Sequence, residues 1–165
     1  MADLKALSEA VIKGDQNKAL EITKAAIAES MAPAKILNDG LIAGMNVIGV
    51  RFKNNEVYIP EVLIAARAMK TAMEVLEPKL VEAGVQPLAK AAVGTVQGDL
   101  HDIGKNLVVM MLKGAGFDVV DLGVDVSPQK FVDRIKEVKP KVVGMSALLT
   151  TTMPSMEKTI KAIKD

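Results

Sequence analysis

His101 is the only histidine of the chain and lies in the segment GDLHDIGKN, residues 98–106, directly after the apolar run at residues 91–96. A neutral imidazole can bind a metal through one ring nitrogen while the other donates a hydrogen bond to a carboxylate. That second bond fixes the tautomer and raises the basicity of the metal-binding nitrogen. Asp99 is the natural partner, so the segment predicts a metal-ligand site. A polar turn with a solvated histidine is the alternative.

Composition limits what such a site could contain. The 165 residues are 50% hydrophobic and 25% charged, enough for one large or two small globular domains. The chain has no cysteine, which excludes thiolate zinc sites, disulfides and thiol nucleophiles. A net charge of +1 and 2% aromatic residues give no sign of nucleic-acid binding. No apolar run reaches the roughly 18 residues that span a bilayer. We therefore expect a cytoplasmic protein that binds neither nucleic acid nor membrane.

The first half of the chain has helical periodicity. Asp3 and Asp15 are placed to cap two helices, a third is expected from about Pro33, and a fourth from about Pro60, a favourable first-turn proline. The apolar residues expected to face the core on the fourth helix are Leu63, Ala66, Met69, Met73 and Leu76. Four amphipathic helices predict a small helical bundle.

The second half of the chain alternates strands with helices. The short apolar runs are residues 91–96, 118–122 and 142–146, and the helical patterns between or after them are residues 102–113, 128–138 and 154–164. This alternation predicts a parallel sheet with helices on both faces, whose ligands bind beyond the carboxyl ends of the strands. With a linker at residues 84–87, we expect two domains: a helical bundle at residues 1–86 and a flavodoxin- or Rossmann-like α/β domain at residues 87–165.

Hydroxyl side chains and glycines gather at the same predicted sheet edge. Ser146, Thr150 and Thr152 end or follow the third apolar run, and hydroxyl groups can hydrogen-bond a buried polar ligand better than they can fill a core. Thr152 could equally be the N-cap of the next helix. Gly98 and Gly104 would let the backbone approach a large planar ligand, or could simply form a tight turn.

Asp99, His101 and Gly104 match the Asp-x-His-x-x-Gly signature position for position, so the chain resembles the cobalamin-binding proteins of methyltransferase systems. That group includes the methylotrophic corrinoid proteins and the cobalamin-binding region of methionine synthase. The resemblance implies that His101 replaces dimethylbenzimidazole as the lower cobalt ligand and that Asp99 hydrogen-bonds His101. Ser146 and Leu148 match the family's Ser-x-Leu element. The run at residues 121–125 also resembles the family, where it lies near the corrin.

The resemblance extends to the helical half. Phe52, Ile59 and Val62 fall at positions of the domain that caps the upper, methyl-bearing face of the cobalamin. An apolar lid would keep water and oxygen away from the methyl–cobalt bond. Bundle core is the alternative for these side chains. Thr152 falls where methionine synthase has the serine that extends the aspartate–histidine relay, so the chain departs from the pattern there.

The resemblance therefore implies a helical cap followed by a cobalamin-binding α/β domain, with cobalamin as the cofactor and His101 as the metal ligand. The residues implied in cofactor binding are Phe52, Ile59, Val62, Gly98, Asp99, His101, Asp102, Ile103, Gly104, Ser146, Leu148, Thr150 and Thr152. The family continues with a later strand that ends in a Gly-Gly element, so the α/β domain is expected to be incomplete at its C-terminus and to bind cobalamin weakly.

The function implied is that of a methyl carrier, the corrinoid subunit of a methyltransferase system. It would carry a methyl group on cobalt from a substrate-specific methyltransferase to a second one acting on tetrahydrofolate, coenzyme M or a similar acceptor. A reductive activation protein would be a further partner. A cobalamin sensor or storage module is the alternative, although no output domain is recognisable. A receiver or nucleotide binder fits poorly, because the chain has no phosphate-binding Gly-x-x-x-x-Gly-Lys loop and no acceptor aspartate after the third predicted strand.

Overall fold

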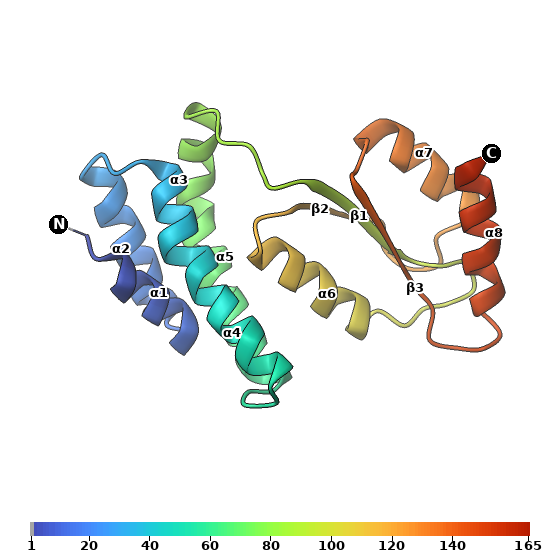
Figure 1. The fold of residues 1–165 in the computed structure, drawn as a ribbon, viewed down its shortest axis with the longest axis horizontal. Helices are drawn as coiled ribbons and strands as arrows, with labels where there is room; N and C mark the ends of the chain where they lie inside the picture. The colour runs from blue at the N-terminus through green and yellow to red at the C-terminus, as the bar shows by residue number, and fades with distance from the viewer. Residues whose placement is uncertain (1) are drawn as a thin grey trace. The chain divides into compact units, whose positions relative to one another are not determined.

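The computed structural model describes residues 2–165, which divide into two compact units, one ending at Gln86 and the other spanning Pro87–Asp165. The described part of the first unit is built from helices, and the second has a parallel sheet with helices (Figure 1). No helix in the described part of the chain is long and apolar enough to cross a membrane.

The helical unit begins its helices where the sequence supplies caps. Its elements are α1 Leu4–Lys13, α2 Gln16–Ala28, α3 Pro33–Lys35, the π-helical segment η1 Ile36–Ile42, α4 Ala43–Lys53 and α5 Ile59–Glu82. The Asp3 carboxylate accepts hydrogen bonds from the first amides of α1, and the Asp15 carboxylate accepts one from the Lys18 amide of α2. Because α3, η1 and α4 follow one another without a break, the unit is the predicted bundle of four helical stretches.

Close packing explains the irregular third stretch of this bundle. The side chains of Leu7, Val11, Ile36 and Leu41 are fully buried at its core. A Cβ atom at Gly40 in η1 would lie 2.5 Å from a Leu7 methyl carbon. Only glycine therefore allows η1 to approach α1 this closely.

The buried face of α5 differs from the predicted stripe. Leu63 is 39% exposed, whereas Val62 and Ala65 are buried; Met69 and Leu76 are buried as predicted. A helical period of 3.6 residues permits either stripe. Helix α2 packs against α5, and the buried face of α5 carries the small side chains Ala65, Ala68 and Ala72.

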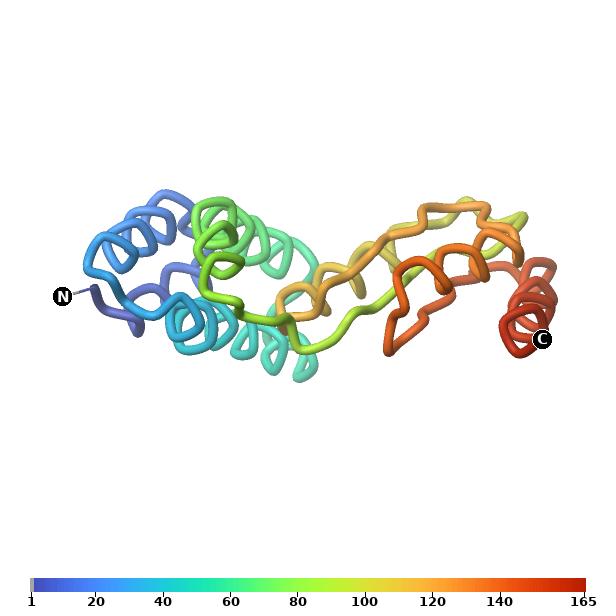
Figure 2. Tube along the Cα trace, turned by 90° about the horizontal axis from the view of Figure 1, so that it is seen from above, coloured from blue at the N-terminus to red at the C-terminus, as the bar shows by residue number. Residues whose placement is uncertain are grey.

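The second unit is a three-stranded parallel sheet with strand order β2-β1-β3. Its elements are β1 Lys90–Thr95, α6 Ile103–Gly114, β2 Asp118–Asp121, α7 Pro128–Val138, β3 Val142–Ser146 and α8 Met153–Lys164. Ala92 of the central strand is aligned with Val120 on one side and Val143 on the other. Helix α6 packs on one face, while α7 and α8 lie side by side on the other (Figures 1 and 2).

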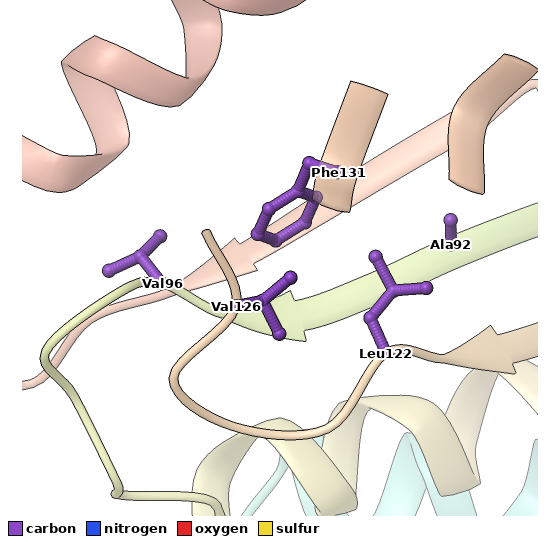
Figure 3. Close-up of a cluster of buried hydrophobic side chains, with 5 residues drawn as sticks. All are labelled: Ala92, Val96, Leu122, Val126 and Phe131. Atoms are coloured by element: carbon purple, nitrogen blue, oxygen red, sulfur yellow. The ribbon is translucent and has the colours of Figure 1, made fainter. Parts of the chain in front are cut away.

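Alternate side chains of β1 pack on opposite faces of the sheet. Ala92 belongs to the cluster around Phe131 of α7, which Figure 3 shows over the strand. Ala91 and Val93 pack with Val109 of α6 on the opposite face. Strands β2 and β3 both follow β1 in the chain but pair with its opposite edges, so the loops after β1 and β3 diverge at a topological switch point, where open α/β sheets bind ligands. The predicted fold class, a helical unit followed by a flavodoxin-like parallel sheet, is confirmed.

Candidate functional site

A buried carboxylate joins the two loops at the switch point. Asp99, which follows β1, has no exposed surface. Its Oδ1 accepts a hydrogen bond from the His101 amide at 2.9 Å. Its Oδ2 accepts from the Leu148 amide at 2.8 Å and from the Thr152 hydroxyl at 2.7 Å, both beyond the end of β3. One side chain therefore ties together segments about fifty residues apart.

These donors keep Asp99 charged. The Thr152 hydroxyl lowers the pKa of the carboxyl most, followed by the backbone amides of His101 and Leu148; burial raises it, and the His101 ring lowers it further. The net result is a pKa far below the ordinary aspartate range. Asp99 is therefore an anion at any pH near neutrality.

The charged Asp99 orients the ring of His101. The ring Nδ1 lies 2.8 Å from Asp99 Oδ1, and a carboxylate can only accept, so Nδ1 carries the proton in this hydrogen bond. In the neutral ring Nε2 then carries no proton, and its lone pair can bind a metal. The side chain is 51% exposed, and no residue in the described part of the chain hydrogen-bonds Nε2. The site thus offers one oriented nitrogen to a ligand from outside.

A single nitrogen restricts the kind of metal that fits. Among residues 2–165, no group of three or more His, Cys, Asp or Glu side chains is placed to hold a metal ion. Protein sites for bare zinc or similar ions supply three or four ligands. His101 instead fits a metal whose other positions are already filled by a chelating cofactor.

A cavity of about 290 Å³ opens beside the histidine loop. Gly104 and Lys105 at the start of α6 line one wall, and Gly144 and Ser146 of β3 line another. It therefore lies between the elements that diverge at the switch point. Its walls mix glycine backbone, a hydroxyl and apolar side chains, a lining able to receive a ligand with both polar and apolar parts.

The structure brings several predicted residues of the α/β unit together at the Asp99 carboxylate. His101, Leu148 and Thr152 each donate a hydrogen bond to this carboxylate, whereas Gly98, which directly precedes Asp99, donates to Asp125. Thr152 contributes its hydroxyl to Asp99 rather than to a helix cap, because α8 begins after Thr152 without a side-chain capping bond. The predicted alternative, an N-cap hydrogen bond from Thr152, is therefore not formed.

Other predicted residues lie outside that hydrogen-bond network. Asp102 precedes α6 and accepts a hydrogen bond from the Asn106 side chain. Ile103 is 75% exposed, and Thr150 is exposed with no side-chain hydrogen bond in the described part of the chain. These residues surround the loop without ordering the histidine ring directly.

The predicted lid residues differ in how exposed their side chains are. Phe52 and Ile59 are 37% and 41% exposed on either side of the turn between α4 and α5. Val62 is 1% exposed, so its side chain belongs to the core of the helical unit and would support this turn from within.

The sequence analysis missed Lys105, and it named Asp125 only as part of the run at residues 121–125, without a role of its own. Lys105 is 5% exposed and lines the cavity; its place four residues before Val109 puts it on the buried face of α6, which is the signal that could have revealed it. Asp125 accepts a hydrogen bond from the Gly98 amide at 2.8 Å. Its backbone is left-handed, with φ 51°, and no pattern in the sequence announces that conformation for an aspartate.

Comparison with known proteins identifies the family of this site. Two families described as B12 binding domains match residues 3–77 and 89–165. A corrinoid protein of Desulfitobacterium hafniense strain Y51 is 37% identical over 100% of this chain and 78% of its own length. The chain belongs to the corrinoid protein family. The predicted resemblance and the predicted cofactor class, a cobalamin-type corrinoid, are thereby confirmed.

Further relatives of this corrinoid protein are named for methylated substrates. Trimethylamine corrinoid protein 1 of Methanosarcina acetivorans is 39% identical over 95% of this chain and 74% of its own length. In the crystal structure of the methanol:cobalamin methyltransferase complex MtaBC from Methanosarcina barkeri, one chain matches with a TM-score of 0.85 and 29% identity, over 98% of this chain and 61% of that one.

Proposed function

We propose that this corrinoid protein carries a methyl group between a substrate-specific methyltransferase and a second methyltransferase acting on tetrahydrofolate, coenzyme M or a similar acceptor. The observation that carries the proposal is the Asp99–His101 pair, which presents one unprotonated, half-exposed nitrogen at the sheet edge. The names of the relatives, trimethylamine corrinoid protein and methanol:cobalamin methyltransferase complex, support a role in methyl transfer.

The residues of the α/β unit fit a bound corrinoid. His101 would supply the lower axial nitrogen, and Asp99 would hold the ring in the tautomer that leaves Nε2 free. Gly104 and Ser146 line the cavity beside the loop and would contact the nucleotide tail, together with Gly98, Leu148 and Thr150. Asp102 and Ile103 would meet the edge of the corrin.

When bound, the corrinoid supplies a cobalt ion that accepts and releases the methyl group. The protein's contribution is to ligate, orient and shield. Phe52 and Ile59 present apolar side chains at an exposed turn of the helical unit, and we assign them to a lid that excludes water, with Val62 supporting the turn. A reducing compartment suits this chemistry, so we place the protein in the cytoplasm.

The partners that follow from this function are a methyltransferase for the methylated substrate, a methyltransferase for the acceptor and a protein that restores the reduced cofactor. The protein itself would be a carrier subunit rather than a complete enzyme. In the related MtaBC structure a corrinoid protein is assembled with a methyltransferase, which supports the first of these partnerships.

Electron paramagnetic resonance of the cob(II)alamin-loaded protein tests the ligand. With ¹⁵N-labelled histidine, the nitrogen splitting should change from a triplet to a doublet, because the only histidine supplies the axial nitrogen. His101→Ala should remove this coupling, and added free imidazole should restore it as a triplet. A triplet in the labelled parent would mean that the cofactor's own base stays on cobalt and would refute the assignment.

A second measurement tests the carrier role. Protein loaded with methylcobalamin should donate its methyl group to coenzyme M through an added acceptor methyltransferase more efficiently than free methylcobalamin does. The control is His101→Ala at equal cofactor occupancy. If free and bound methylcobalamin are used equally well by each acceptor methyltransferase tried, the protein is a binding or storage module.

A further inference from the structure

A buried ammonium group lies beside the cofactor site and touches none of the residues that orient the histidine ring. The side chain of Lys105, in the first turn of α6, is 2% exposed. Its Nζ lies 2.7 Å from both carboxylate oxygens of Asp121 and 2.7 Å from Asn106 Oδ1. An ammonium group has three protons, so all of its donors are used and none is left for a ligand in the cavity.

The hydrogen bonds of this pair continue in both directions. Asp121, at the end of β2, also accepts from the Gly123 amide at 2.9 Å. The Asn106 side-chain amide donates to Asp102 Oδ2 at 2.9 Å. The chain of contacts thus runs from the loop after β2, through Lys105, to the residue that directly follows His101.

The loop after β2 also holds the other end of the histidine loop. The Asp125 side chain accepts from the Gly98 amide at 2.8 Å, and the Asp125 amide donates to the Asp99 carbonyl at 3.0 Å. The segment carrying His101 is therefore fixed on both sides by one neighbouring loop. The imidazole is free to bind an external ligand, while the backbone beneath it is not free to move.

Stability alone is a weak reason for such a pair. Desolvating the buried Lys105 ammonium costs several kcal/mol, and its attraction to the 37% exposed Asp121 carboxylate must first offset that cost. What the pair supplies instead is a defined geometry, because three hydrogen bonds hold the Lys105 ammonium between Asp121 and Asn106. Burial raises the pKa of Asp121, but the hydrogen bonds from Lys105 and the Gly123 amide, with the charges of Lys105 and Lys113, together lower it below the ordinary value, so the carboxyl stays charged and the pair stays ionic.

We propose that Lys105 and Asp121 are positioning residues that fix the loop carrying His101, so that its free nitrogen is presented to the metal in one orientation. This inference rests on the proposed role of His101 as axial ligand. It extends that role to Lys105 and Asp121, neither of which contacts the histidine ring.

The test uses Lys105→Met and the double variant Lys105→Met/Asp121→Asn, which removes both charges but keeps an acceptor for the Gly123 amide. In cob(II)alamin-loaded protein with ¹⁵N-histidine, the ratio of histidine-ligated to unligated cobalt should fall by about tenfold, the lower end of the effect of outer-shell changes at metal sites. The double variant should unfold at a temperature near that of the parent while showing the same loss.

Val119→Ala is the matched control, because Val119 is buried in the same unit on the face covered by α6 but has no contact with the histidine loop. It should lower the unfolding temperature and leave the ligated fraction unchanged. If Val119→Ala and Lys105→Met lower the ligated fraction equally, the pair acts only through stability and the proposal is wrong.

A readout without cofactor separates this inference from the proposed function. The single histidine gives one set of ring signals in ¹⁵N nuclear magnetic resonance of the cofactor-free protein. The parent should show the Nδ1-protonated tautomer alone, and Lys105→Met should show a mixture. Unchanged ring signals in both variants would overturn the positioning role, whereas a parent that lacks histidine coupling to cobalt but keeps its single tautomer would overturn only the ligand assignment.

Discussion

Replacing Gly104 with alanine should stabilise the cofactor-free protein and weaken cobalamin binding. Gly104 is the second residue of α6, and a Cβ atom built there meets no atom within 4 Å. Its backbone is not left-handed, so the cofactor-free fold gives no reason for glycine. Alanine in a helix is favoured over glycine by roughly 0.5–1 kcal/mol, which should raise the unfolding temperature by about 2–8 °C for a unit of this size.

The added methyl group would enter the cavity that Gly104 lines. If the nucleotide tail fills this cavity, the extra methyl costs roughly 1–3 kcal/mol of overpacking, which weakens binding by about tenfold or more. Thermal unfolding followed by circular dichroism and titration with aquocobalamin measure the two effects.

Gly98→Ala is the control for this prediction. Gly98 has φ +84°, and its Cβ would lie an ordinary 3.8 Å from the Thr152 methyl carbon, so alanine there suffers only backbone strain of about 1–2 kcal/mol. Gly98→Ala should lower the unfolding temperature, opposite in sign to Gly104→Ala. Parent-like aquocobalamin affinity in Gly104→Ala would refute the placement of the tail in this cavity.

Two further predictions concern the carboxylate and the lid. Because the folded pKa of Asp99 is lowered, its charge stabilises the fold above the unfolded value of about 3.9, and that contribution is lost as the pH falls toward the folded value. Asp99→Asn should thus lower the free energy of unfolding at neutral pH, and its difference from the parent should shrink below about pH 4; a difference independent of pH would contradict this. Phe52→Ala should speed photolysis of bound methylcobalamin at equal occupancy with little loss of stability, since Phe52 is 37% exposed. Equal photolysis rates would remove Phe52 from the lid.

The sequence predicted the elements and the central pair of the site because local patterns determine them. Capping aspartates mark the starts of α1 and α2, and apolar runs mark the three strands within about a residue. Asp99 and His101 are two residues apart, so their contact depends on one turn of backbone. Such features depend only on residues that are close together in the sequence.

Features that depend on packing between distant segments were missed. The π-helical segment at residues 36–42 depends on how closely Gly40 meets Leu7 of another helix. The burial of Lys105 depends on Asp121, sixteen residues later and on another strand. The sequence allowed Thr152 to be either a site residue or the N-cap of the next helix. The hydrogen bond from its hydroxyl to Asp99, which follows the first strand, decides for the site.

The hydrogen bonds of Asp99 also set the order in which the site can form. Its partners Leu148 and Thr152 follow it by 49 and 53 residues. At the usual rate of about 5–20 residues per second, a ribosome needs roughly 3–10 s to make that stretch. During this interval the Asp99 carboxylate lacks the Thr152 hydroxyl and the Leu148 amide, two of the donors that hold it in place. A nascent chain stalled before Thr152 would thus already carry His101 but would have no fixed ring to offer, so binding of a cofactor through His101 would follow the docking of β3.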